Sequence, residues 1–207
     1  MKRAALLVLL VATRAQAQSG ADAHMLAGAR HFQASRYPEA LVEFRVAEKL
    51  SDAGAIWYVA ATLMKMKRPE DALVEFARAE SAAPDERDGL LDYYHALACY
   101  DARLYFCADR LLAALGEQPG PRIAAQARKI RADLAPILSG PPAIATVDCY
   151  HALAQEAIKA GRSALGGAYY DEAASLAALR PDAHRRAEAL AGLAQTRQQQ
   201  GPKPARQ

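Results

Sequence analysis

Three cysteines carry the most direct covalent chemistry in this chain of 207 residues: Cys99, Cys107 and Cys149. In an oxidising compartment, an odd count predicts one disulfide and one free thiol. Cys99 and Cys107 flank an expected turn between two helices, so they are close enough to bridge them. Such a small loop would stabilise the fold by about 2–3 kcal/mol. The alternative is that all three are small, buried apolar residues, and the sequence leaves both interpretations open.

Catalytic motifs are absent from the sequence. The histidines form no H-E-x-x-H motif and no close ligand pair with a cysteine, and there is neither a C-x-x-C nor a phosphate-binding glycine loop. The segment "GRSALG" from Gly161 is one residue too long for a nucleophile elbow, and no strand precedes it. We therefore expect no enzyme, no metal site and no small-molecule cofactor. The histidines considered are His24, His31, His95, His151 and His184.

The first 17 residues have the pattern of an export signal. Lys2 and Arg3 precede an apolar run over residues 4–12, and Ala15-Gln16-Ala17 forms a small-x-small cleavage site. The run is shorter than the ~20 residues that span a bilayer, and no cysteine follows the cut to carry a lipid. We expect residues 1–17 to be a signal peptide and the mature chain to be periplasmic or secreted.

Removal of this segment also removes the apparent basic charge. The chain has 26 Lys+Arg and 23 Asp+Glu, and residues 1–17 contain three basic and no acidic side chains, which leaves 23 of each. A balanced mature chain gives no reason to expect a nucleic-acid partner or an anionic membrane surface.

A dozen residues occur twice, about 32 positions apart. "EALVEFRVAEKL" begins at Glu39 and "DALVEFARAESA" at Asp71. Apolar residues recur every three or four positions in both, which predicts amphipathic helices. A proline-containing turn precedes each, and another helical stretch with a small residue midway precedes each turn. The repeating unit is therefore two helices joined by a tight turn. Such units bury their apolar faces by stacking on their neighbours.

This unit resembles the tetratricopeptide repeat (TPR), a helix-turn-helix of about 34 residues. The resemblance implies an all-α fold, with antiparallel hairpins stacked into a right-handed superhelix, an α-solenoid. Three hairpins would occupy residues 18–120, and the third has Leu112 where the others have Phe. The matching positions are Gly28, Tyr37, Ala40, Phe44 and Ala47, then Ala60, Ala72, Phe76, Ala79 and Pro84, then Ala96, Tyr105 and Ala108.

The pattern is looser in the second half of the chain. Residues 121–146 read as an amphipathic helix, a Gly/Pro breaker and the start of a linker, "AIATVD", over residues 143–148. Residues 147–200 resemble a degenerate fourth hairpin with a capping helix, and 201–207 a disordered tail. In one register Gly161 is the small residue and Gly166-Gly167 the turn. The "YHALA" at Tyr150, which repeats that at Tyr94, gives another register; both stay open.

An aromatic and methionine stripe is the main candidate for a binding site. Pairs seven residues apart lie on one face of the first helix of each hairpin. In the TPR family the matching face lines a concave groove that binds a partner segment, and these residue types are enriched in protein-binding surfaces. The expected groove residues are Met25, Phe32, Trp57, Met64, Tyr93, Leu97 and Tyr100.

Ordinary packing is the alternative for this stripe, with the helix over residues 121–138 filling the groove. Some TPR domains bind an acidic peptide terminus through a cluster of basic residues on this face. Here the expected polar groove residues are Asp22, Gln33, Lys65 and Asp101, which form no basic cluster, so an apolar or amphipathic ligand segment fits better.

The sequence thus predicts an exported, non-catalytic bacterial scaffold that binds a protein or peptide of the cell envelope. A structural protein that self-associates through its terminal helix, as a homo-oligomer, is the second hypothesis. An enzyme whose site is assembled from scattered polar residues is the third and least favoured.

Overall fold

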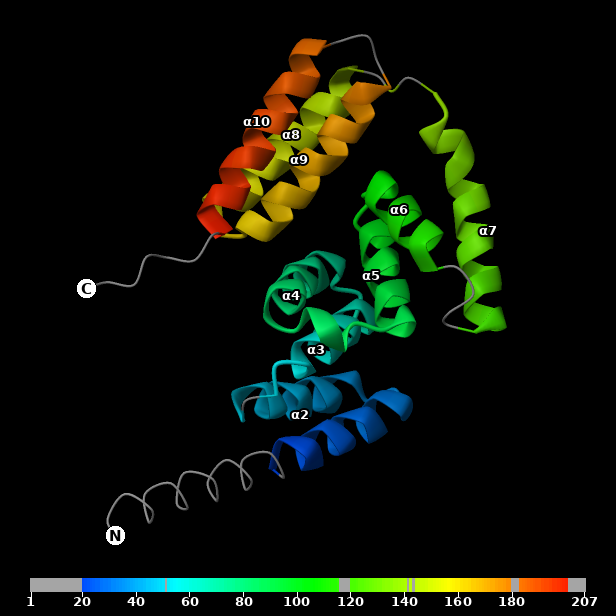
Figure 1. Cartoon of the computed structure of the whole chain (residues 1–207), viewed down its shortest axis with the longest axis vertical. Helices are drawn as coiled ribbons and strands as arrows, with labels where there is room; N and C mark the ends of the chain where they lie inside the picture. The colour runs from blue at the N-terminus through cyan, green and yellow to red at the C-terminus, as the bar shows by residue number, and fades with distance from the viewer. Residues whose placement is uncertain are drawn as a thin grey trace, which may run out of the picture. The chain divides into compact units, whose positions relative to one another are not determined.

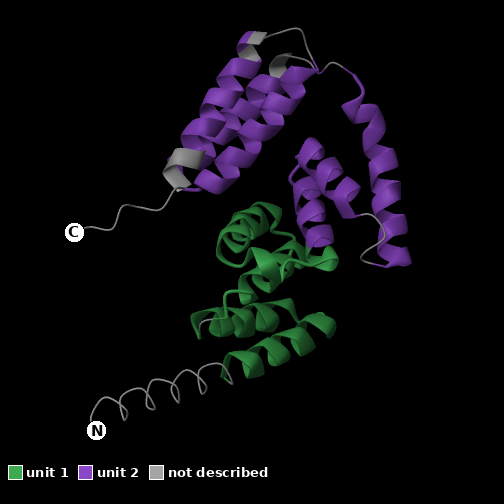
Figure 2. Cartoon of the chain, in the orientation of Figure 1, with its two compact units in different colours: residues 1–91 green, residues 92–207 purple. Residues whose placement is uncertain are grey.

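The computed structural model describes residues 20–50, 52–115, 120–140, 142, 144–179 and 183–200, and every regular element among them is a helix. The all-α prediction is confirmed for this part of the chain. The expected signal peptide and the expected tail lie outside it. The chain divides into two units, residues 1–91 and 92–207 (Figure 2). None of the described helices is both long and apolar enough to cross a membrane.

Unit 1 consists of two helix hairpins (Figure 1). The first pairs the helix over residues 20–33 with α2 (Tyr37–Lys49), and the second pairs α3 (Ala55–Lys65) with α4 (Pro69–Ala82). The single 3-10 turn η1 (Pro84–Glu86) follows. The repeated Ala-Leu-Val-Glu-Phe lies in α2 and α4, and each of these helices has a proline in its first turn. Helix α2 packs against α3, which joins the two hairpins.

The repeated phenylalanines lie at the centre of these hairpins. Phe44 and Phe76 are both buried. A Cβ atom on Gly28 would lie 2.6 Å from the Phe44 ring, so only glycine lets the ring pack on that helix. Phe44 also contacts Tyr58 of the next hairpin, with ring centroids 5.4 Å apart. The same aromatic position therefore closes one hairpin and connects it to the next.

A network of four charges joins α2 to α4. Arg45 donates to Glu75 at 2.5 Å and to Glu48 at 2.8 Å, and Arg78 donates to Glu48 at 2.6 Å and also to Glu75. The half-buried Arg45–Glu75 pair links α2 to the equivalent helix of the next hairpin. Two arginines satisfy the nearly buried Glu75 carboxylate, so the network fixes the register between these helices.

Unit 2 contains the remaining hairpins and helices. Helix α5 (Gly89–Asp101), whose first three residues belong to unit 1, forms a hairpin with α6 (Tyr105–Leu115), and α7 (Pro121–Leu138) follows. Ala96, Leu112, Leu115 and Ala127 form a core shared by these three helices. Helices α8 (Ile144–Lys159), α9 (Ser163–Ala178) and α10 (Ala183–Gln200) form a second core, which also includes Phe106 of α6. The expected linker "AIATVD" is wrong in part, because α8 already begins at Ile144.

Helices α8 and α9 pack together as the fourth hairpin of the described chain. All four hairpins use the same two-residue turn. Its first residue has a left-handed backbone: Ser35 (φ 59°), Lys67 (φ 60°), Arg103 (φ 63°) and Gly161 (φ 75°). Its N–H donates to the carbonyl three residues earlier, and the next N–H donates to the carbonyl five residues earlier, at 2.8–3.1 Å. This is a Schellman motif. The carbonyl of the second turn residue then accepts the first hydrogen bond of the following helix.

The shared turn gives the four hairpins one common register. Counted from the first turn residue, the positions seven residues earlier and five residues later are small and buried in every hairpin. They are Gly28, Ala60, Ala96 and Ala154, and Ala40, Ala72, Ala108 and Gly166.

Both registers considered for the fourth hairpin are therefore wrong. Gly161 is the turn itself, because its left-handed backbone suits glycine. Gly166 and Gly167 lie inside α9, where a Cβ on Gly166 would meet the Ala154 carbonyl oxygen at 3.0 Å. When the turns of the third and fourth hairpins are aligned, Tyr94 corresponds to Ala152 and not to Tyr150. The two "YHALA" segments are therefore offset by two residues.

The turn geometry predicts opposite signs for two substitutions. Ser35→Gly should stabilise the chain by about 0.5–1 kcal/mol, because a non-glycine residue at a left-handed position is strained. Gly161→Ala should destabilise it by about 1 kcal/mol. Urea unfolding of each variant measures both effects.

Ser81→Gly in α4 is the matched control, since the same change within a helix should destabilise by up to ~1 kcal/mol. A destabilised Ser35→Gly variant would contradict the role of the turn.

Candidate functional site

The centre of the predicted stripe belongs to the core of unit 1. Trp57 is fully buried, its indole N–H donates to the Ala83 carbonyl at 2.8 Å, and its ring packs on Phe76 with centroids 6.0 Å apart. Met64 is also buried. Neither side chain offers surface to a partner, which agrees with the packing alternative at these two positions.

Helix α7 covers part of the stripe in unit 2. Tyr93 packs against the core of α5, α6 and α7, and its hydroxyl donates to Gln126 of α7 at 3.2 Å. The segment 121–138 thus contacts the stripe at Tyr93, which stays half-buried. Tyr100 is the most exposed residue of the stripe, at 37%, and its ring lies 6.0 Å from that of Tyr105.

The remaining members of the stripe are half-buried: Met25, Phe32 and Leu97. Phe32 packs edge-on against Tyr37 at 5.5 Å. In unit 1 the buried Trp57 and Met64 interrupt the expected apolar floor. In unit 2 the stripe residues Tyr93, Leu97 and Tyr100 keep part of their surface exposed.

A polar hollow lies in unit 2, between α8 and α10. Its volume is about 630 Å³, within the range of ligand sites. Tyr170 of α9 and Gly192 of α10 form part of its lining, and the Tyr170 ring leaves no room for a Cβ on residue 192, which would lie 2.5 Å away. The side chains on the walls are Asp148, His151 and Gln155 from α8, and Glu188 and Gln195 from α10.

The hollow has acidic and amide chemistry. Asp148 and Glu188 contribute a carboxylate from each wall, and Glu188 also pairs with His184 at 3.2 Å. His151 packs edge-on against Tyr170 at 5.6 Å. Two carboxylates and two amides in one depression favour cationic groups and hydrogen-bond donors.

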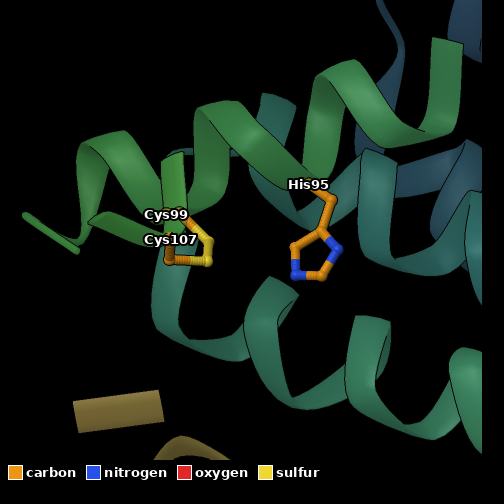
Figure 3. A group of neighbouring side chains, drawn as sticks. All are labelled: His95, Cys99 and Cys107. Carbon is orange, nitrogen blue, oxygen red and sulfur yellow. A yellow bond between two sulfur atoms is a disulfide. The ribbon is translucent and has the colours of Figure 1, made fainter. Parts of the chain in front are cut away.

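A second cluster lies at the turn of the third hairpin and contains sulfur. Cys99 and Cys107 are bonded as a disulfide across this turn, with Cα atoms 5.9 Å apart, and Cys149 is an exposed free thiol. This pairing agrees with the disulfide interpretation. His95 lies one helical turn before Cys99, on the same side of α5 (Figure 3). The expectation that no histidine lies close to a cysteine is therefore wrong for His95, because residues i and i+4 share a helix face.

Glu172 of α9 caps α6 beside this cluster. Its carboxylate accepts hydrogen bonds from the backbone N–H groups of Phe106 (2.9 Å) and Cys107 (3.3 Å), the free donors of the first turn of α6. Burial raises the pKa of Glu172 to about 7, although these donors lower it. Close by, the Tyr150 hydroxyl donates to the Arg103 carbonyl at 2.6 Å. Polar groups of α8 and α9 thus hold the turn end of the third hairpin.

The signals for these sites differ in the sequence. The four-residue spacing of His95 and Cys99 could have indicated a shared face. Nothing local indicates Glu172, because its partners lie 65 and 66 residues away.

Comparisons of the chain with protein-family models, curated proteins and solved structures find no match.

The raised pKa of Glu172 predicts a pH-dependent stability. Between its usual value of 4.5 and about 7, the folded chain keeps a proton that the unfolded chain releases, so the free energy of unfolding should fall as pH rises through this window. The loss should be about 3 kcal/mol and complete above about pH 7. Denaturant unfolding at pH 5 and pH 8 measures it.

Glu172→Gln cannot ionise, so it should reduce this pH dependence by the same amount. Glu156→Gln on the exposed face of α8 is the control and should leave the dependence unchanged. Equal slopes for wild type and Glu172→Gln would show that the Glu172 carboxyl does not carry the effect.

Proposed function

We propose that the protein is a non-catalytic helical-repeat scaffold of the TPR type that binds a partner protein in the bacterial cell envelope. Four hairpins with one turn geometry and one set of small, buried positions support the repeat part of this proposal. The Cys99–Cys107 disulfide supports an oxidising compartment, periplasmic or extracellular. The right-handed superhelix is part of the same proposal.

The polar hollow between α8 and α10 is the proposed binding site, and it carries the proposal. The centre of the expected aromatic floor is occupied by the chain itself, since Trp57 and Met64 are buried. Tyr93 is half-buried against α7. The hollow, in contrast, is open and lined by side chains from two helices.

A basic segment is the partner chemistry that fits this hollow. Asp148 and Glu188 lie on opposite walls, and Gln155 and Gln195 add amide donors and acceptors. A lysine or arginine side chain could bind between the carboxylates, and the aromatic ring of Tyr170 also lines the hollow. This replaces the apolar ligand expected from the stripe.

Neutral substitutions at the two carboxylates test the proposal. A labelled peptide of alternating lysine and alanine should bind the full chain, and Asp148→Asn and Glu188→Gln should each weaken binding about fivefold, which corresponds to about 1 kcal/mol. Added salt should weaken binding further, because the contact is electrostatic. Fluorescence anisotropy measures all of these affinities.

Glu156→Gln is again the matched control, because Glu156 lies on α8 but outside the hollow. Its affinity should equal that of the wild type. Equal binding of a glutamate–alanine peptide, or unchanged affinity in both hollow variants, would overturn the proposed site.

Self-association is the second candidate function. Leu190 of α10 is 48% exposed, on the helix expected to mediate contact between copies. Light scattering at increasing protein concentration tests this candidate. A strict monomer excludes it, and dissociation of an oligomer by Leu190→Lys supports it.

A further inference from the structure

The cluster at the turn of the third hairpin brings three soft metal-ligating groups together. His95 and Cys99 project from one face of α5, and Cys107 projects from the first turn of α6 (Figure 3). Their candidate ligand atoms, one ring nitrogen and two sulfurs, all lie within 4.8 Å of one another. Cys99 is fully buried, and the other two side chains are half-buried.

The backbone around these groups is already fixed. The Cys99 carbonyl accepts the Leu104 N–H at 2.8 Å within the Schellman turn, and the Cys107 N–H donates to Glu172 at 3.3 Å. His95 and Cys99 lie one helical turn apart on α5. The three side chains therefore start from positions that the fold sets without a metal, which lowers the cost of assembling a site.

The geometry requires only side-chain movement to hold a metal. In a tetrahedral zinc site, Zn–S bonds of about 2.3 Å and Zn–N bonds of about 2.0–2.1 Å place the ligand atoms about 3.5–3.8 Å apart. With Cα atoms 5.9 Å apart, rotation of the two cysteine side chains can separate the sulfurs to this distance once their bond is broken.

We propose that reduction of the Cys99–Cys107 disulfide converts this cluster into a Zn²⁺ site made of two thiolates and the His95 imidazole. A dithiol reductant supplies two electrons and two protons to the S–S bond and itself becomes a disulfide. The two thiols then release two protons as Zn²⁺ binds. The fourth zinc position is open to water. Disulfide and metal exclude each other, because both states need the same two sulfur atoms.

Cobalt is the probe for the experiment, since thiolate-bound Co²⁺ absorbs light and Zn²⁺ does not. The full chain with Cys149→Ser serves as the parent, because the exposed Cys149 thiol would compete for metal. After reduction and removal of the reductant without oxygen, the parent should bind one Co²⁺ per chain with a sulfur-to-cobalt charge-transfer band. Zn²⁺ should displace the Co²⁺ and, added alone, release two protons per chain to an indicator dye.

Three comparisons decide the proposal. The oxidised parent should bind no Co²⁺. Cys107→Ser should lose most of the charge-transfer intensity, and His95→Gln should keep the band but bind on the order of 100-fold more weakly, since even the loss of an outer-shell partner costs 10–100-fold. His184→Gln, an exposed histidine on α10, is the control and should bind like the parent.

Circular dichroism of the reduced chain shows whether a missing Co²⁺ signal results from loss of helical structure on reduction. If reduction lowers the helical content, Zn²⁺ should restore it, and no recovery would overturn the proposal. A reduced parent without a charge-transfer band, or equal affinity of the His95→Gln variant and the parent, would leave the cluster as a disulfide beside an ordinary histidine.

Discussion

The close approach of the two helices within each hairpin is the contact on which the rest of this structure depends. A left-handed turn residue reverses the chain in two residues, so the second helix starts directly against the first. The helices can pack this closely only where both carry small residues. Gly166 shows the limit, because even a methyl group there would meet the backbone of α8. Alanine or glycine at these positions is therefore a steric requirement of the turn. In the second helix of each hairpin, a large residue four positions after the small one fills the space beside it: Phe44, Phe76, Leu112 or Tyr170.

The third and fourth hairpins depart from this pattern at the positions that carry chemistry. Four residues before and after the first turn residue, the third hairpin has Cys99 and Cys107, where the second has Leu63 and Asp71. These positions face each other across the turn, which explains why the two sulfurs meet. Tyr170, in the fourth hairpin, occupies the position of the repeated phenylalanines and lines the hollow beside α10. The repeated hairpin sets the backbone positions. Different residue types at a few of these positions form the disulfide and part of the hollow.

The sequence was sufficient for features that repeat or lie close together along the chain. The doubled "ALVEF" and its prolines predicted the hairpins of unit 1, and the spacing of Cys99 and Cys107 predicted their proximity. The register of the fourth hairpin could not be read, because Gly161, Gly166 and Gly167 all suit a turn, and only the backbone angle separates them.

The burial of Trp57 and the contact of Tyr93 with α7 were also beyond the sequence. A helix face of Trp, Tyr and Met has the same periodicity whether it binds a partner or packs against the chain. For Trp57 the deciding facts are an acceptor on Ala83, 26 residues away, and contact with Phe76. For Tyr93 the decision depends on α7, whose docking no local pattern encodes. Long-range contacts of this kind determined which of the two interpretations applied.

Helix α7 also changes how the fourth hairpin can attach to the third. It lengthens the connection between them, so a direct continuation of the repeat is replaced by docking at the turn end of α5 and α6. Apolar contact through Phe106 alone has little directionality. Glu172 supplies it, because a carboxylate must point at the free N–H groups of α6, and Tyr150 adds a second directed bond to Arg103. Burying Glu172 costs desolvation energy, as its raised pKa shows. Its main contribution is therefore a defined register between the two hairpins, with their net stability resting on the apolar cores around it.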